Sequence, residues 1–328
     1  MLNTPDLYKY TSYNDLLIDI KKNLYKLHHG NYDLVVGIPR SGMVPAYTIG
    51  LFLNIHVTDF DSFIENKPLK SGLTRNVKYN IENSHDAKRV LLVDDTISSG
   101  KQLQLKKEKI PGYLKNKITS LAIYSTLDTN LVDIYFELVG YKRLYEWNIF
   151  HRDYLQNACL DIDGVLCVDP SQDEDDDGHK YINFLNNAKP YLLPSYKVHS
   201  LVTNRLEKYR QQTETWLKKY NIKYDHLIML DTPTKATKYK TGIYMDHKAN
   251  YFNSSSKLEV FIESSEKEAI HIMKKSGKPV LCISTNRMIH PTMKSLMQNN
   301  KQSFKSYLRR SLINILPTSL KRFLKRFI

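Results

Sequence analysis

The fold of this chain is decided by the stretch Val90-Leu91-Leu92-Val93-Asp94-Asp95-Thr96-Ile97-Ser98-Ser99-Gly100. The apolar residues at its start are typical of a buried parallel strand, and two acids follow at the carboxyl end of that strand. A hydroxyl-rich turn comes next, where backbone N–H groups at the start of a helix can bind an anion. Thr96, Ser98 and Ser99 add hydroxyl donors, and Gly100 lets a phosphate approach the backbone closely. The stretch therefore offers groups for both a phosphate and a sugar diol.

On both sides of this stretch, short apolar runs alternate with helical patterns. Residues 12–29 carry Leu and Ile at the spacing of an amphipathic helix, and Val44–Phe52 is expected to form a second helix. The strands expected in this half are Tyr32–Ile38, Arg89–Val93, Ser120–Ser125 and Asp133–Val139. Strands that alternate with helices predict a parallel α/β sheet, which we assign to residues 1–153.

A second α/β domain is expected over residues 154–290. A new strand starts after the boundary near Asp153–Gln156 and leads directly into Asp161-Ile162-Asp163-Gly164-Val165. The strands expected here are Ala158–Ile162, Lys197–Thr203, His226–Leu230, Leu258–Ile262 and Pro279–Ile283. Long helical patterns separate these strands, so the predicted fold class is α/β with two parallel-sheet domains.

Charge and composition point to anionic partners. The 328 residues carry a formal net charge of +14, but residues 301–328 hold eight Lys or Arg and no acid, which leaves +6 on the rest. Such a charge suits phosphorylated metabolites and does not require nucleic acid. The three cysteines form no CxxC pair, which argues against a zinc ribbon or a redox dithiol. The first residues lack the apolar run of a signal peptide, and no apolar run is long enough to span a membrane, so a cytoplasmic protein is expected.

The Val90–Gly100 stretch resembles the phosphoribosyl pyrophosphate signature of type I phosphoribosyltransferases. The resemblance implies that Asp94 and Asp95 hold the ribose hydroxyls and that Thr96–Gly100 binds the 5-phosphate. The segment Gly37-Ile38-Pro39-Arg40-Ser41-Gly42 stands where that family has its pyrophosphate loop, so Arg40 and backbone amides would bind the diphosphate beside Mg²⁺. The residues implied in phosphoribosyl pyrophosphate binding are Arg40, Ser41, Gly42, Asp94, Asp95, Thr96, Ser98, Ser99 and Gly100.

Two further features follow from the same resemblance. The family's mobile flap would be Asn66–Val77, with Lys67, Lys70 and Arg75 as diphosphate contacts. Members that act on 6-oxopurines carry an acid where Ser98 stands here, and that acid is the proton partner of the base. Ser98 cannot take this part, which argues against hypoxanthine or guanine as the acceptor.

The segment Asp161-Ile162-Asp163-Gly164-Val165 can aim two carboxylates into one pocket, since a strand leads into it and a glycine follows the second acid. One carboxylate can attack phosphorus while the other handles protons. Mg²⁺ beside such a pair offsets the charge of a phosphate dianion. The segment resembles the first motif of haloacid-dehalogenase phosphatases. This implies that Asp161 is the nucleophile and that Asp163 is the general acid/base, with its backbone carbonyl facing Mg²⁺.

The later motifs of that class follow in order along the chain. Thr203 matches the phosphate-binding hydroxyl, Glu263 the acidic fourth motif, and Lys248 is the preferred lysine, with Lys235, Lys238 and Lys240 left open. The implied catalytic residues are Asp161, Asp163, Thr203 and Lys248, and the implied Mg²⁺ ligands are Asp161, Asp163 and Glu263.

The second resemblance has one departure in the fourth motif. Ser264 stands where a second acid is common, and Glu266 would have to act through water in its place. The interval between Asp163 and Thr203 leaves room only for a small cap, which fits a bulky substrate better than a small metabolite.

The two resemblances together place a maker of ribose 5-phosphate glycosides beside an enzyme that removes phosphate. In nucleotide salvage this pairing would be self-defeating, because the phosphate traps the product. The pairing resembles the bifunctional ribofuranosyltransferases of bacterial surface-polysaccharide assembly. That resemblance implies phosphoribosyl pyrophosphate as donor and a glycan hydroxyl, lipid-linked in many such pathways, as acceptor. Two alternatives stay open: a salvage enzyme that acts on a free base, and a regulator that senses phosphoribosyl pyrophosphate.

Residues 291–328 are predicted to form a basic amphipathic tail. Pro317 divides Lys301–Ile328 into two short helical pieces, and each piece has an apolar stripe. Such a tail can lie on the anionic inner face of a membrane. The alternative is a helix that packs on the protein's own body or at the interface of a homo-oligomer.

Overall fold

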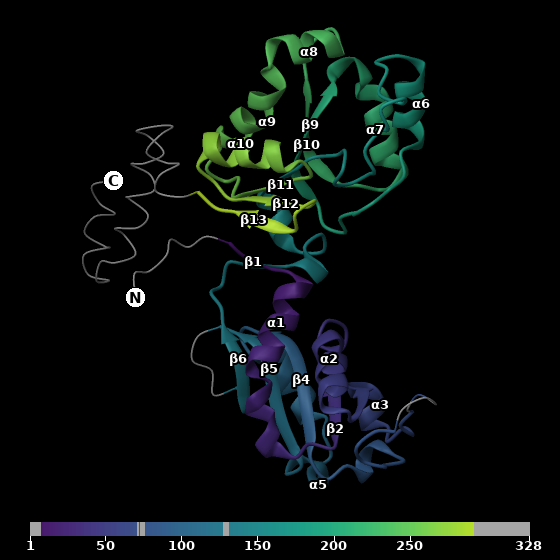
Figure 1. Cartoon of the computed structure of the whole chain (residues 1–328), viewed down its shortest axis with the longest axis vertical. Helices are drawn as coiled ribbons and strands as arrows, with labels where there is room; N and C mark the ends of the chain where they lie inside the picture. Colours follow the sequence, from purple (N-terminus) through teal and green to yellow (C-terminus); the bar gives the residue numbers. More distant parts are fainter. Residues whose placement is uncertain (1–7, 71, 73–75, 127–130, 292–328) are drawn as a thin grey trace, which may run out of the picture. The chain divides into compact units, whose positions relative to one another are not determined.

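The structure is a computed structural model that describes residues 8–70, 72, 76–126 and 131–291 (Figure 1). The chain forms two compact units: the first unit is Thr11–Trp147, and the second unit joins Met1–Tyr10 to Asn148–Ile328. The predicted tail from residue 292 onward and Arg75 of the predicted flap lie outside the described residues. In the described ranges, no helix is long and apolar enough to cross a membrane.

The first unit is built on a five-stranded parallel sheet. Its strands are β2 (Leu34–Gly37), β3 (His56–Asp59), β4 (Val90–Ile97), β5 (Ile118–Ser125) and β6 (Ile134–Leu138), in the order β3-β2-β4-β5-β6. All neighbouring strands run parallel, so their carboxyl ends lie along one edge of the sheet. The central strand, β4, is the one that carries Asp94 and Asp95.

Helices cover both faces of this sheet. They are α1 (Tyr13–Asn23), α2 (Met43–Leu53), α3 (Phe60–Ile64), α4 (Lys101–Glu108) and α5 (Gly112–Lys115). One core cluster joins α1 and α2 to one sheet face through Leu16, Ile49 and Leu91. A second cluster joins α3 and α4 to the other face through Phe60 and Leu103. The sheet is therefore buried on both faces, as its continuous apolar runs predict.

The second unit is built on a six-stranded sheet. Its strands are β8 (Ala158–Leu160), β9 (Val198–Leu206), β10 (Tyr224–Leu230), β11 (Val260–Glu263), β12 (Val280–Cys282) and β13 (Arg287–Ile289), in the order β10-β9-β8-β11-β12-β13. All pairs are parallel except β12 with β13. The carboxyl ends of β8, β9 and β11 therefore meet at one edge, where Asp161, Thr203 and Glu263 lie.

The helices of the second unit are α6 (His179–Asn187), α7 (Arg210–Lys219), α8 (Lys235–Thr241), α9 (Ile243–Asn253) and α10 (Glu266–Ser276). Helices α9 and α10 cover one sheet face, where Phe252 and Ile272 pack on Phe261 in a core cluster. The three cysteines are free and buried. The short remaining elements are β1 (Lys9–Thr11), β7 (Arg143–Tyr145) and the 3₁₀ helices Leu24–Gly30, Ser84–Asp86, Glu146–Asn148, Asp153–Asn157 and Glu207–Tyr209.

The α/β class and the parallel sheets are confirmed, while two strands run further than predicted. β4 continues through Ile97 because β5 still pairs with it, with Thr96 opposite Tyr124. β9 continues through Leu206, which pairs with Leu230 of β10. β3 and the antiparallel β13 are strands that the sequence did not predict. The domain limits 1–153, 154–290 and 291–328 stay predictions, as does the phosphatase-type fold of the second unit.

Candidate functional site

The first site begins with Asp95, a buried carboxylate in β4 that is 2% exposed. Its Oδ1 accepts a hydrogen bond from the Ser41 hydroxyl at 2.8 Å, and its Oδ2 accepts one from the Trp147 indole N–H at 2.7 Å. Both oxygens are thus held by groups of the protein. Asp95 ties the Gly37–Gly42 loop and Trp147 to β4, and its predicted contact with a ribose hydroxyl stays a prediction.

Asp94 is the more available of the two acids. It is partly buried, and its Oδ1 accepts a hydrogen bond from the Asp95 backbone N–H at 3.0 Å. Burial, and secondly the neighbouring Asp95 carboxylate, raise the pKa of Asp94 to about 8. No cationic side chain in the described residues forms an ion pair with it. A carboxyl that is buried beside a second acid, with no cation paired to it, lowers the stability of the fold when it ionises. Such a group is suited to a ligand that brings hydroxyl donors.

The Gly37–Gly42 loop packs directly against the end of β4. The Ile38 N–H donates to the Val93 carbonyl at 2.9 Å. A Cβ on Gly42 would lie 2.5 Å from the Ile38 carbonyl oxygen and 2.9 Å from that of Val93, so only glycine fits there. The peptide between Pro39 and Arg40 is cis. The structure therefore brings this loop and the acid pair to the same edge of the sheet.

The remaining residues predicted for the first site lie around that edge. Arg40, Ser98 and Ser99 are exposed, and Gly100 has φ +71° where α4 begins. The Thr96 hydroxyl lies 3.1 Å from the Tyr145 hydroxyl. In the expected flap, Lys67 forms an exposed ion pair with Glu65, and Lys70 is exposed.

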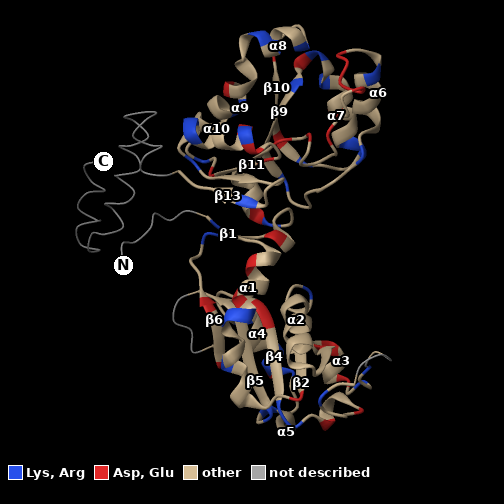
Figure 2. Cartoon of the chain, in the orientation of Figure 1, with Lys and Arg blue, Asp and Glu red and all other residues tan. Residues whose placement is uncertain are grey.

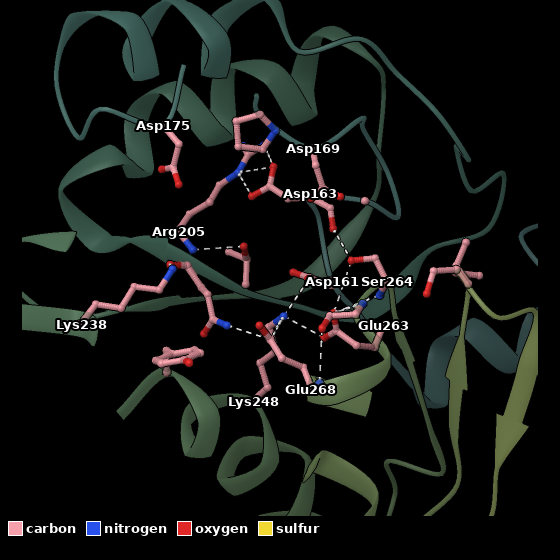
Figure 3. A pocket seen from close by; sticks show the side chains of 18 of the residues that line it. Asp161, Asp163, Asp169, Asp175, Arg205, Lys238, Lys248, Glu263, Ser264 and Glu268 are labelled. Carbon is pink, nitrogen blue, oxygen red and sulfur yellow. Dashed lines mark hydrogen bonds and ion pairs between the residues drawn. The ribbon is translucent and has the colours of Figure 1, made fainter. Parts of the chain in front are cut away.

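The second site is organised by the buried ammonium group of Lys248, whose side chain is 3% exposed (Figure 3). Its Nζ lies 2.6 Å from Asp161 Oδ2, 2.7 Å from Glu263 Oε2 and 2.8 Å from Glu268 Oε2. Burial alone would favour the neutral amine, but the three carboxylates raise the pKa of Lys248 well above its ordinary value. Of the four candidate lysines, the structure brings Lys248, the one that the sequence analysis preferred, to Asp161.

The other three lysines lie in α8 and differ from one another. Lys235 is ion-paired with Asp175 at 2.6 Å, and Lys240 is exposed. Lys238 lines the same pocket as Asp161, and its Nζ donates to the Asn204 carbonyl at 3.2 Å.

Asp163 is held by Arg205, which the sequence analysis did not single out. Arg205 is fully buried, and its Nη2 lies 2.6 Å and its Nε 3.0 Å from the two Asp163 carboxylate oxygens. Burial would raise the pKa of Asp163, but the guanidinium lowers it below its ordinary value. Asp163 is therefore a carboxylate, the form that can accept a proton from water.

The fourth-motif region folds over the backbone of Asp163. Glu263 is 1% exposed, and its Oε1 accepts from the N–H groups of Ser264 and Ser265 at 2.9 and 3.1 Å. The Ser264 hydroxyl donates to the Asp163 carbonyl at 3.1 Å. Gly164, with φ +72°, leaves room for Ser264, since a Cβ there would lie 2.5 Å from its hydroxyl. Glu266, the predicted substitute for a second acid, does not line the pocket.

The predicted Mg²⁺ ligands are only partly brought together. Among the described residues, no group of three or more His, Cys, Asp or Glu side chains is arranged to hold a metal ion. The Asp161 and Glu263 carboxylates converge on Lys248, while Asp163 contributes its carbonyl to this edge and its carboxylate to Arg205. Two carboxylates and a carbonyl are a donor set that suits Mg²⁺, which keeps several waters and substrate oxygens in its shell.

These groups line a pocket of about 700 Å³. Thr203 lies in it, 1% exposed, and its Oγ1 accepts from the Arg205 N–H at 3.2 Å. The pocket is also lined by residues that the sequence analysis missed: Asp169, Asn204, Arg205 and Glu268, with Tyr181, Tyr191, Tyr239 and Tyr244 around them. Asn204 and Arg205 follow Thr203 directly in one strand, which is a signal that could have found them. Six carboxylates face three cationic side chains in this pocket, so it has an excess of negative charge that a divalent cation would reduce.

One family model matches part of the chain. Residues 9–155 match the family model described as phosphoribosyl transferase domain. A search of the curated proteins gave no match.

Three solved structures are similar to less than half of this chain. A purine phosphoribosyltransferase from Pyrococcus horikoshii Ot3 is 21% identical with a TM-score of 0.32, and the match covers 43% of this chain and 93% of that one. The Helicobacter pylori xanthine-guanine-hypoxanthine phosphoribosyltransferase is 18% identical with a TM-score of 0.31, covering 43% and 94%. A hypothetical protein from Neisseria gonorrhoeae with bound ppGpp is 17% identical with a TM-score of 0.31, covering 44% and 91%.

The raised pKa of Asp94 predicts a pH-dependent stability. Its carboxyl releases a proton near pH 4 when unfolded but near pH 8 when folded, so stability falls as the pH rises through this window. Asp94→Asn removes this loss, and the variant should gain several degrees in Tm over wild type at pH 8, with a smaller gain at pH 5. One kcal/mol corresponds to about 2–8 °C. The measurement is thermal unfolding at both pH values, with the exposed Glu82→Gln as control. A gain that is equal at pH 5 and pH 8 would contradict the prediction.

Proposed function

We propose that this chain, which carries a phosphoribosyl transferase domain at residues 9–155, is a bifunctional enzyme. Its first unit would transfer ribose 5-phosphate from phosphoribosyl pyrophosphate to an acceptor. Its second unit would then remove the 5-phosphate, which leaves a plain ribofuranosyl group. The observation that carries the second half is the Lys248 ammonium between Asp161, Glu263 and Glu268 in a pocket with Thr203 and Asp163.

The transfer step is supported by the edge of the first sheet. Asp94 offers a partly buried carboxyl for ribose hydroxyls, and the exposed hydroxyls of Ser98 and Ser99 precede the amides at the start of α4. The Gly37–Gly42 loop lies beside them with the exposed Arg40 for the diphosphate. In the reaction, the acceptor oxygen bonds to C1 of the ribose, the bond from C1 to the diphosphate breaks, and the acceptor proton passes to solvent.

The phosphatase step is supported by the geometry around Asp161. An oxygen of its carboxylate would attack phosphorus, and the bond from phosphorus to the ribose oxygen would break, with that oxygen taking up a proton from solvent. Water would then attack the phosphoryl group, and the bond from phosphorus to the Asp161 oxygen would break, which releases inorganic phosphate. Asp163 as carboxylate would accept the proton of that water. The Thr203 hydroxyl would donate to a phosphate oxygen, while Lys248 would hold the Asp161 carboxylate in place. Mg²⁺, held by Asp161, Glu263 and the Asp163 carbonyl, would offset the negative charge that the phosphate adds to this pocket.

A glycan hydroxyl is the acceptor class that we favour. Removal of the 5-phosphate is useful when the wanted product is a ribofuranosyl residue, and it undoes the trapping of a nucleotide. Ser98 provides no acid to act as the proton partner of a 6-oxopurine, and it is exposed at the end of the predicted phosphate cradle. This acceptor places the enzyme in surface-polysaccharide assembly, on the cytoplasmic side where phosphoribosyl pyrophosphate is made.

The donor site is tested by the same Asp94→Asn variant that should stabilise the fold. At pH 9, where Asp94 is ionised, the variant should bind phosphoribosyl pyrophosphate with Mg²⁺ about tenfold more weakly or worse, because a carboxylate that accepts from a diol is replaced by an amide. The measurement is isothermal titration calorimetry, with Glu82→Gln as control. Unchanged affinity in a variant that is folded would exclude Asp94 from the donor site.

The phosphatase site is tested by hydrolysis of ribose 5-phosphate. Asp161→Asn should lower kcat by at least about 10³-fold, since it removes the attacking oxygen while keeping the size of the side chain. Phosphoribosyl pyrophosphate binding should stay at the wild-type value. The matched control is Asp231→Asn, an exposed acid just after β10. Hydrolysis by Asp161→Asn at a rate near that of wild type would remove Asp161 from the role of nucleophile.

A further inference from the structure

Three cationic side chains line the pocket of the second unit, and two of them are neutralised within it. Lys248 contacts three carboxylates, and Arg205 contacts both oxygens of Asp163. The third is Lys238, whose Nζ donates to the Asn204 carbonyl at 3.2 Å and forms no ion pair with any acid in the described part of the chain. Two of its three ammonium donors are therefore left for a ligand.

Lys238 is held so that its ammonium faces the pocket. Helix α8 carries Lys235, Lys238 and Lys240, and Figure 2 shows basic residues in blue on this helix. The rings of Tyr239 and Tyr244 lie 5.3 and 5.8 Å from Lys238 Nζ. Burial lowers the pKa of Lys238 from its ordinary value. A half-buried cation without an ion-pair contact is costly, and a ligand oxygen would reduce that cost.

The neighbouring Asn204 side chain has an unused acceptor. Its Nδ2 donates to Glu268 Oε2 at 2.9 Å, which fixes the orientation of the amide. Its Oδ1 is buried and accepts no hydrogen bond. Such an unmet acceptor costs about 1–3 kcal/mol. Asn204 and Lys238 line the same pocket.

The two groups together select the chemistry of the ligand. An anion would satisfy Lys238 but would bring no hydrogen for Asn204 Oδ1, and the pocket already has more carboxylates than cations. A hydroxyl serves both groups, since its oxygen accepts from Lys238 and its hydrogen donates to Asn204. We propose that Lys238, with Asn204, forms a subsite for the sugar hydroxyls of the phosphorylated substrate. This deepens the proposed phosphatase function, on which it rests, by assigning the residues that recognise a pentose.

The test compares two phosphate esters that differ in their leaving group. Ribose 5-phosphate has ring hydroxyls, whereas phenyl phosphate presents the same phosphate without them. Lys238→Met should lower kcat/KM for ribose 5-phosphate by about 10–100-fold and change that for phenyl phosphate by less than about threefold. Lys240→Met, on the same helix but exposed, should leave both values unchanged. Wild type should also prefer ribose 5-phosphate to 2-deoxyribose 5-phosphate or to 3-deoxyribose 5-phosphate, and Lys238→Met should lose that preference.

Two kinetic outcomes would overturn the subsite. An equal loss on ribose 5-phosphate and phenyl phosphate would mean that Lys238 acts on the phosphate itself. No loss on either ester would mean that Lys238 does not take part.

A binding measurement separates this inference from the proposed activity. In the Asp161→Asn background, calorimetric titration should give tighter binding of ribose 5-phosphate than of inorganic phosphate. Adding Lys238→Met should remove that difference by weakening ribose 5-phosphate alone. If wild type hydrolyses no ester, the phosphatase function fails, but this titration still decides the subsite. Equal affinity for ribose 5-phosphate and inorganic phosphate with Lys238 present would refute the subsite.

Discussion

The ion cluster around Lys248 is the constraint on which the second unit depends. Asp161, Glu263 and Glu268 come from the end of β8, the end of β11 and the first turn of α10, and one ammonium from α9 contacts all three. Carboxylates this deeply buried are unstable without a counter-charge, and loss of one partner of such a cluster costs about 3–5 kcal/mol. The cluster therefore holds four elements in register, and it sets Asp161 at the base of a pocket that Thr203 and Arg205 share.

The two acids at the site of the first unit, Asp94 and Asp95, have no cationic partner among the described residues, unlike the acids around Lys248. Asp95 is satisfied by two neutral donors, Ser41 and Trp147, while Asp94 is left with a raised pKa and with no cation paired to it among the described residues. Ionisation of Asp94 is a cost to stability, and hydroxyl donors of a bound ribose would reduce that cost. The second unit has a related surplus, because six carboxylates line its pocket against three cations. In both units the folded chain is short of positive charge where we propose that Mg²⁺ and phosphate arrive together.

The sequence predicted the sheets well because their strands are continuous apolar runs, and the acids at strand ends needed no further information. It predicted that the strands would stop at Val93 and Thr203, but pairing with β5 and β10 carries them on to Ile97 and Leu206. The local sequence pattern could not predict which side chains contact these acids, because the partners are distant in the sequence. Trp147 reaches Asp95 from 52 residues away, and Arg205 reaches Asp163 from 42 residues away. Glu268 carries no motif, and the fold alone places it in the pocket, whereas Lys238 was one of the lysines that the sequence left open.

The central claim is that one chain transfers ribose 5-phosphate to a glycan hydroxyl and then hydrolyses the 5-phosphate. The most direct measurement is mass spectrometry of glycan acceptors incubated with phosphoribosyl pyrophosphate, Mg²⁺ and either the wild-type chain or Asp161→Asn. A panel of free bases serves as the alternative acceptors. The account predicts that wild type yields a glycan heavier by one pentose, and that Asp161→Asn accumulates the glycan heavier by one pentose phosphate. A phosphoribosylated base in place of a modified glycan, or a failure of Asp161→Asn to make the first product, would contradict it.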